Sequence, residues 1–344
     1  MRRIGATVLL LLAAAAWAPT AGEPAKNVIL IGWDGAQRAH IQECLQRGEL
    51  PTLARLSKEG ALVDIVIEGV TDTKAGWSQI LTGYDPEVTG VYSNLRYQPI
   101  PKGLTVFERL EQHFGPNRFV TVAVIGKLGN VDDGPPIRRP LRPNISPERR
   151  RQLLRGGGRI VEEDGTTYLV VPGKPYYNAS PALDFWRNGL IEDDKVGELT
   201  LELLEKYRDR PFFFFVHFAS VDHNGHRFGE NSKEYNDALI SNDRWTGRIL
   251  AKLRELGIYD KTIVYVTADH GFDEGQKTHK NAPYVTLATN DPRGLVPGKR
   301  VDIAPTILDA FGLDLASFRP PLDGKSLIRE KRVIGSPSGP RRKP

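Results

Sequence analysis

The sequence of 344 residues contains one cysteine, Cys44. A lone cysteine forms no intramolecular disulfide and has no partner for a thiolate metal cluster, which excludes a disulfide scaffold. Any metal site in this chain must therefore use nitrogen and oxygen ligands. The residues around Cys44 have a helical pattern, and we expect its thiol to be a small buried or half-buried side chain.

The chain also lacks a charge excess in its body. It has 47 Lys and Arg against 42 Asp and Glu, a formal net charge of +5. Residues 1–22 and 329–344 together hold eight of the basic residues and one acidic residue, which leaves 39 basic and 41 acidic residues between them. A nearly neutral body gives no support for a nucleic-acid partner. The 40% hydrophobic and 26% charged content is that of an ordinary globular protein.

No apolar run is long enough to span a membrane. The longest, residues 8–18, has eleven residues and follows Arg2 and Arg3, and small residues continue to Gly22. This pattern predicts a signal peptide over 1–22, with cleavage after Ala18 or Ala21. We expect an exported protein, periplasmic or secreted, without a membrane span, and a disordered basic tail over 331–344.

Four buried strands are predicted from continuous apolar runs at 27–32, 119–125, 211–217 and 262–267. Helical patterns lie at 38–60, with a break at Pro51, and at 195–207 and 232–256. Alternating strands and helices of this length predict an α/β fold: a doubly wound, mostly parallel sheet with helices on both faces. We expect one catalytic domain over 27–330, with ligands bound at the carboxyl ends of the strands.

One segment, about 130–190, departs from this pattern because it is rich in Pro, Gly and Arg. We expect an inserted, irregular cap over one edge of the sheet. Whether it is a solvated flap or an anion-attracting wall of the substrate cleft stays open.

Acidic and imidazole side chains follow three of the predicted strands. An Asp after a strand is commonly a cap or turn residue, and a single His is commonly structural. Three such strand ends at one sheet edge, however, favour a site for zinc or a similar first-row metal. The candidate ligands are Asp34, Asp222, His226, Asp269, His270 and, nine residues further on, His279.

A nucleophile is expected at another junction, where a strand over 61–67 leads into a helix that ends at Thr82. Hydroxyl groups at a helix start serve as N-caps, but the helix N-terminus also stabilises an alkoxide or a phosphoryl oxygen. Thr71, Thr73 and Ser78 are the candidates, and periodicity does not rank them.

These motifs, in this order, resemble the alkaline phosphatase superfamily, specifically its type I phosphodiesterase/nucleotide pyrophosphatase branch. That family has its nucleophile ten residues before the Gly of a Thr-Gly pair, which matches Thr73 before Gly83, and a phosphate-contacting Asn about twenty residues later, which matches Asn94. The resemblance implies two zinc ions, other divalent metals being possible. One would be held by Asp34, Thr73, Asp269 and His270, and the other by Asp222, His226 and His279.

Departures from the related families decide between substrate classes. Sulfatases resemble the chain at Lys127, but they need a Cys or Ser where Thr73 stands. Thr-type monoesterases have Lys-x-Arg in this place, and the chain has Lys127 followed by Leu128 and Gly129.

The resemblance therefore implies a phosphodiesterase that acts through a phosphothreonine on Thr73, with Asn94 and Lys127 as further catalytic residues. The alternatives are a phosphate monoesterase, a sulfatase-like hydrolase and a non-catalytic binding protein on the same fold. The substrate would be a small anionic phosphate ester. Its leaving group and the oligomeric state are not defined by the sequence.

Overall fold

The computed structural model describes residues 25–142, 144–155 and 158–329, so the predicted signal peptide and basic tail lie outside the described residues. At its centre is a sheet with the strand order β11-β2-β10-β9-β1-β8-β3-β7. The strands are β1 (Asn27–Trp33), β2 (Ala61–Val66), β3 (Val120–Ile125), β7 (Phe185–Arg187), β8 (Phe212–Phe218), β9 (Thr262–Thr267), β10 (Tyr284–Thr289) and β11 (Gly298–Lys299). Strands β9, β1, β8, β3 and β7 pair in parallel, whereas β10 is antiparallel to both of its neighbours.

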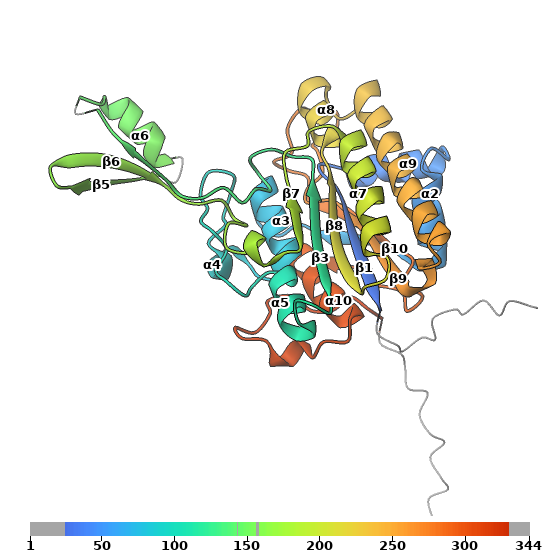
Figure 1. Cartoon of the computed structure of the whole chain (residues 1–344). Coiled ribbons are helices and arrows are strands. Elements are labelled where there is room, and N and C mark those ends of the chain that lie inside the picture. The colour runs from blue at the N-terminus through green and yellow to red at the C-terminus, as the bar shows by residue number, and fades with distance from the viewer. Residues whose placement is uncertain (1–24, 143, 156–157, 330–344) are drawn as a thin grey trace, which may run out of the picture.

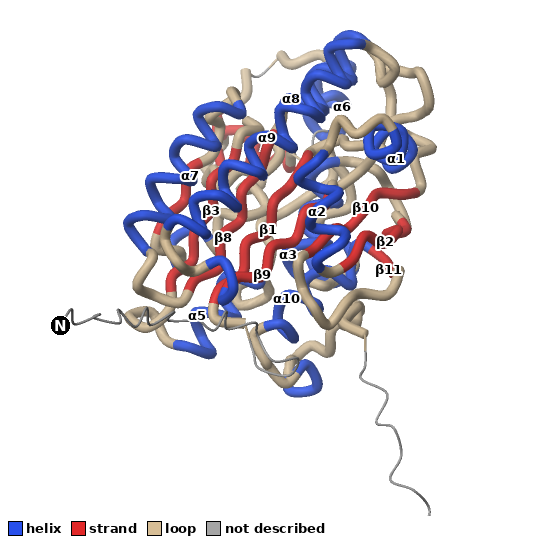
Figure 2. The backbone as a smooth tube through the Cα atoms, turned by 90° about the vertical axis from the view of Figure 1, so that its right-hand side faces the viewer, coloured by secondary structure: helices blue, strands red, loops and turns tan. Residues whose placement is uncertain are grey.

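Helices cover both faces of this sheet (Figures 1 and 2). On one face lie α2 (Pro51–Glu59), α7 (Asp193–Tyr207) and α9 (Lys233–Glu255), near α1 (Arg38–Gln46) and α8 (Ser220–Phe228). On the other lie α3 (Thr73–Thr82), α5 (Val106–Phe114) and α10 (Ile303–Ala310), with the short α4 (Pro86–Thr89) next to α3. The fold is therefore the expected α/β fold, a mostly parallel sheet between two layers of helices.

The apolar runs form the buried centre of the sheet. Every residue of β1, β3 and β8 is buried, as expected for parallel strands covered on both faces. The long predicted helix over 38–60 is in fact two helices, because Pro51 occupies the first turn of α2 and cannot donate a backbone hydrogen bond inside a continuous helix. Cys44 is buried in α1, as expected.

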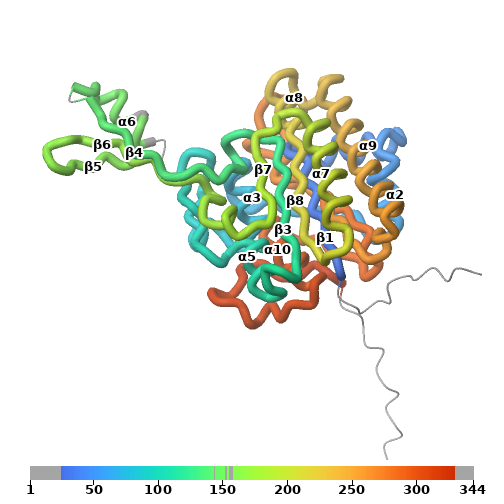
Figure 3. The backbone as a smooth tube through the Cα atoms, in the orientation of Figure 1, coloured from blue at the N-terminus to red at the C-terminus, as the bar shows by residue number. Residues whose placement is uncertain are grey.

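The expected irregular cap is smaller and more regular than the sequence indicates. Residues 172–190 belong to the body, where β7 extends the main sheet beside β3. The rest forms an arm of three antiparallel strands, in the order β4-β6-β5, with one helix. Its elements are β4 (Ile137–Pro140), α6 (Pro147–Arg155), β5 (Arg159–Glu163) and β6 (Thr166–Val171). Figures 1 and 3 show that this arm projects away from the body instead of folding over the sheet.

The described residues contain no helix that combines the length and the apolar character needed to cross a bilayer.

Candidate active site

The candidate ligands lie at the carboxyl ends of four neighbouring strands. Asp34 follows β1, Asp222 lies in α8 after β8, and Asp269 and His270 follow β9. Lys127 follows β3, the neighbour of β8. Because these strands are parallel and adjacent, their ends lie side by side, and this edge is where α/β sheets bind ligands.

The first group that could hold a metal ion consists of Asp34, Asp222 and His270, all of which are buried. His270 Nε2 lies 3.6 Å from Asp34 Oδ1 and 3.5 Å from Asp222 Oδ1. Its other nitrogen, Nδ1, is 2.9 Å from the carbonyl oxygen of Gly271 and donates to it, which leaves the lone pair of Nε2 facing the carboxylates. Burial, with a contribution from His279, lowers the pKa of His270 to about 3, so its imidazole is neutral and suited to bind a metal.

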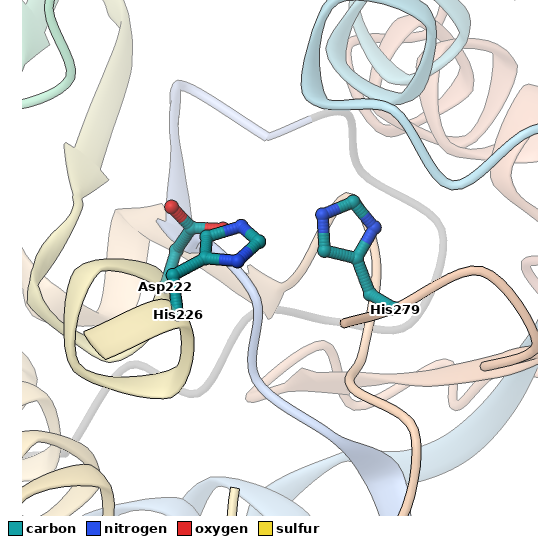
Figure 4. Close-up of side chains that lie close together, drawn as sticks. All are labelled: Asp222, His226 and His279. Carbon is teal, nitrogen blue, oxygen red and sulfur yellow. The ribbon is translucent and has the colours of Figure 1, made fainter. Parts of the chain in front are cut away.

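The second group consists of Asp222, His226 and His279 (Figure 4). Asp222 and His226 are one turn apart on α8, and His226 Nε2 lies 3.4 Å from Asp222 Oδ1. His279 faces them from the loop after β9 and stacks on His270 with 4.0 Å between the ring centroids. Asp222 is common to both groups, so the two candidate metal positions are contiguous.

Asp269 lies beside the first group, with one carboxylate oxygen facing His270. Its Oδ2 lies 3.5 Å from His270 Nε2 and accepts no hydrogen bond from the described residues, and Asp222 Oδ1 accepts none either. Burial, with the nearby Asp34 carboxylate, raises the pKa of Asp269 well above its ordinary value. Buried carboxylate oxygens without donors are what a cation would satisfy, so the residues present fit a divalent metal.

A lysine ammonium lies between the carboxylates. Lys127 Nζ is 2.8 Å from Asp34 Oδ1, 2.6 Å from Asp222 Oδ2 and 3.1 Å from Thr73 Oγ1. Burial alone would lower the pKa of Lys127, but the two carboxylates outweigh it and raise the pKa above the ordinary value. Burial alone would raise the pKa of Asp34, but the Lys127 ammonium outweighs this effect and lowers the pKa of that carboxyl to about 2.

Thr73 lies at the first position of α3, with its hydroxyl in this cluster. Its Oγ1 is 3.4 Å from His270 Nε2, in addition to its contact with Lys127. Of the other two hydroxyl candidates, Thr71 contacts the second group, with its Oγ1 3.2 Å from His279 Nδ1, and Ser78 Oγ is buried without a partner among the described residues. Of the three, only Thr73 contacts the buried ligand group and Lys127.

Asn94 fixes the start of α3 from the side. Its Oδ1 accepts the backbone N–H of Lys74, and its own backbone N–H donates to Asp72 Oδ2. Asp72 is the residue that precedes α3. The amide of Asn94 therefore lies beside the N-terminus of the helix that begins at Thr73.

Two residues that support Asp34 were not identified from the sequence. His217 Nε2 lies 2.8 Å from Asp34 Oδ2, and Trp77 Nε1 donates to the same oxygen at 3.3 Å. From the sequence, His217 falls within a predicted buried strand, where a single His is commonly structural. Strand alternation was the available signal, because Phe215 and His217 share one face of β8, and both pack against the Trp77 ring.

Arg300 connects two loops of the site and was also missed. It is almost fully buried, and it donates to the carbonyl oxygens of Asp269 (2.8 Å), Val70 (2.8 Å) and Glu68 (3.2 Å). One loop carries the ligands Asp269 and His270, and the other leads to Thr73. Nothing in the sequence around Arg300 marks this role.

Comparison with known proteins identifies the family. The sequence profile of the type I phosphodiesterase/nucleotide pyrophosphatase family matches residues 28–305, and the chain belongs to this family. Through it the chain is a member of the alkaline phosphatase superfamily.

Among curated proteins, a bovine (Bos taurus) bis(5'-adenosyl)-triphosphatase, ENPP4, is 23% identical over 255 residues, which are 73% of this chain and 48% of that protein. A rat (Rattus norvegicus) steryl-sulfatase is 29% identical over 160 residues, 37% of this chain and 27% of that protein. The chain thus spans from a quarter to a half of these relatives' lengths.

Solved structures show the same fold. A sulfatase of glycosaminoglycan metabolism from Bacteroides thetaiotaomicron superimposes with a TM-score of 0.62 at 17% identity, covering 92% of this chain and 79% of that one. The lipoteichoic acid synthase LtaP from Listeria monocytogenes gives a TM-score of 0.54 at 15% identity, covering 88% and 75%.

Proposed function

We propose that the protein is an exported, zinc-dependent phosphodiesterase that acts through a phosphothreonine on Thr73. The observation that carries this proposal is the position of the Thr73 hydroxyl, 3.1 Å from Lys127 Nζ and 3.4 Å from His270 Nε2, beside two contiguous ligand groups. Asp34, Asp269 and His270 would hold one ion with Thr73, and Asp222, His226 and His279 the other. Such ions, when bound, lower the pKa of a ligating hydroxyl and neutralise charge on phosphoryl oxygens.

Each step of the proposed reaction has a residue of the site that can carry it out. The Thr73 oxygen attacks phosphorus, its bond to phosphorus forms, and the bond to the leaving alkoxide breaks. The Lys127 ammonium favours the alkoxide form of Thr73 electrostatically. The Asn94 side-chain NH2 group and the backbone N–H of Thr73 bind the non-bridging oxygens, while the backbone N–H of Lys74 donates to Asn94 Oδ1 and orients that side chain. Water then cleaves the bond between phosphorus and Thr73, which restores the hydroxyl and releases the phosphate product.

The preference for diesters rests on the cations at the site. The Arg of the monoesterase motif is missing after Lys127, and the arginines of 138–159 lie in the projecting arm. A diester phosphoryl group carries one negative charge less than a monoester and needs fewer cations.

The test compares rates on bis(4-nitrophenyl) phosphate, 4-nitrophenyl phosphate and 4-nitrophenyl sulfate, with zinc-loaded protein and after chelation. We expect the diester to be hydrolysed fastest, chelation to abolish turnover, and Thr73→Ala to lower kcat by orders of magnitude while zinc stays bound. Ser78→Ala is the matched control, because it removes a hydroxyl from the same helix outside the site. Dominant sulfate turnover, or full activity of Thr73→Ala, would overturn the proposal.

Export rests on the basic start and apolar run of residues 1–22. Expression of the full chain in a bacterial host should give a processed protein in the periplasm or medium, with its new N-terminus after residue 18 or 21. An unprocessed chain retained in the cytoplasm would contradict export.

A further inference from the structure

A second group of basic side chains lies where the arm joins the body, outside both ligand groups. Lys74 Nζ lies 4.8 Å from the centre of the Tyr97 ring, and Lys174 Nζ lies 5.5 Å from the same ring. Lys74 also donates to Asn130 Oδ1 at 2.8 Å, and Lys174 to the carbonyl oxygen of Gly129 at 3.3 Å. Two ammonium groups thus converge on one aromatic side chain.

This pair lies next to the nucleophile. Lys74 follows Thr73 directly in the first turn of α3, and its backbone N–H is held by Asn94. Lys174 lies in the loop that follows β6, and its side chain is 27% exposed, so a ligand can reach it from solvent. Tyr97 and Asn130 are half-buried between them and the surface.

The carboxylates nearby do not fully compensate the two ammonium groups. Asp132 Oδ2 lies 3.5 Å from Lys174 Nζ, and burial raises the pKa of Asp132. Asp132 and Asp72 act on Lys74 only at a distance, and Asp72 accepts the Asn94 N–H instead. Lys74 is therefore left with a neutral amide and a ring as its contacts.

We propose that Lys74 and Lys174 bind a second anionic group of the substrate, a phosphoryl or carboxylate group attached beside the ester that Thr73 attacks. This inference rests on the proposed function and narrows its substrate class to phosphate esters with two anionic centres. A partly buried ammonium pair with only one carboxylate in contact is electrostatically suited to an added anion, and charge-assisted hydrogen bonds supply the affinity. The tyrosine ring keeps the Lys74 ammonium in place by a cation–π contact.

The test measures binding, so that it does not depend on turnover. Zinc-loaded protein is titrated by calorimetry with propylphosphonate and with 3-phosphonopropionate, which differ by one carboxylate at the far end. We expect the second compound to bind about tenfold more tightly to the wild type. Lys74→Met and Lys174→Met should each bring the ratio of the two dissociation constants to within about threefold of unity.

Lys102→Met is the matched control, because Lys102 is exposed in a neighbouring loop and contacts neither ligand group. It should retain the wild-type ratio. Lys174 is half-exposed, so Lys174→Met is expected to fold even if Lys74→Met does not. Zinc content and thermal melting show whether each variant is folded. A wild-type ratio near one, or an unchanged ratio in both lysine variants, would overturn the inference. Absent diester turnover with a retained ratio would instead contradict the proposed function.

Discussion

Lys127 Nζ lies 2.6 Å from Oδ2 of Asp222, the carboxylate that both candidate metal groups share. The same ammonium is 2.8 Å from Asp34, so it lies between the carboxylates that the two ligand groups need. All three side chains are almost completely buried. Without a metal, Lys127 is the main cation that neutralises this pair, and a metal ion must compete with it for the same oxygens.

Replacing Lys127 by Met is therefore expected to have opposite effects on metal-free and metal-loaded protein. In a chelator, the variant should lose about 3–5 kcal/mol of unfolding free energy, because two buried carboxylates lose their partner. Zinc should bind at least about tenfold more tightly, because no ammonium has to move. Thermal melts with and without zinc, and titration in zinc buffers, measure both. Lys195→Met, which removes an exposed ion pair with Glu192, is the control. Equal zinc affinity of wild type and K127M would contradict this account.

The contact of His217 with Asp34 predicts a role that a packed strand histidine would not have. His217→Phe removes the imidazole at 2.8 Å from Asp34 Oδ2 and keeps a ring beside Trp77. Partners that orient a metal ligand are worth about 10–100-fold in metal affinity or activity. We expect a loss of that size in zinc affinity, measured by competition with a chromogenic chelator. His113→Phe, on the outer part of α5, is the control. Unchanged zinc affinity with lowered stability would leave His217 a packing residue.

The strands were predictable because parallel strands buried on both faces are continuously apolar. The expected runs at 27–32, 119–125, 211–217 and 262–267 differ by at most one residue at either end from β1, β3, β8 and β9. Strand β10 was missed because Tyr284–Thr289 is short and mixed in polarity. The strands of the arm were missed because arginines and glycines dominate this segment and its strands bury little: in β6, only Leu169 is buried.

Candidate site residues could be predicted where acidic and imidazole side chains follow predicted strands. They could not be predicted where a side chain contacts residues of other strands. Asp222, His226 and His279 come together as the family resemblance implied. The contact of Lys127 with both carboxylates depends on β3 lying beside β8, which is a property of strand order. Local sequence does not encode that order, so neither this contact nor that of Arg300 could be read from it.

A buried histidine outside both candidate ligand groups predicts a specific dependence of stability on pH. His40 Nδ1 lies 2.5 Å from Glu230 Oε1, and Nε2 lies 3.1 Å from Asn236 Oδ1. Burial alone would lower the pKa of His40, but hydrogen bonds with Cys44, Glu230 and Asn236 raise it to about 10. The folded protein thus holds this proton more tightly than the unfolded chain, whose histidines have a pKa near 6.5.

Because the folded pKa is the higher one, His40 stabilises the fold fully below about pH 6.5 and loses this contribution as the pH rises towards 10. Urea denaturation at pH 6, 8 and 9.5 should show the wild type losing a few kcal/mol that His40→Gln does not lose. His113→Gln should follow the wild type. Parallel pH profiles of wild type and H40Q would show that His40 is neutral in the folded protein.

Arg300 is expected to position the nucleophile relative to the metal ligands without touching the substrate. Its guanidinium holds the carbonyl of Asp269 and those of Glu68 and Val70 together, and burial lowers its pKa to about 10. Gly76 in α3 makes room for this contact, because a Cβ atom there would lie 2.8 Å from Asp269 Cβ and 3.2 Å from Arg300 Nη1. The helix that starts with Thr73 and the loop that carries His270 are thereby fixed to each other.

Arg300→Met should leave the buried carbonyl group of Asp269 and the partly buried carbonyl groups of Glu68 and Val70 without this donor, and the buried one should cost about 1–3 kcal/mol. We expect kcat on the diester to fall at least about tenfold with KM nearly unchanged, because the attacking oxygen is misplaced while the phosphate contacts remain. Arg300→Lys keeps one or two of the donors and should recover part of kcat. If Arg300 had a purely structural role, this variant would recover the melting temperature without recovering kcat. Arg293→Met, which breaks the ion pair with Asp291 on the other side of β10, controls for general destabilisation. If both variants lower the melting temperature equally and neither changes kcat, Arg300 stabilises the fold and does not position Thr73.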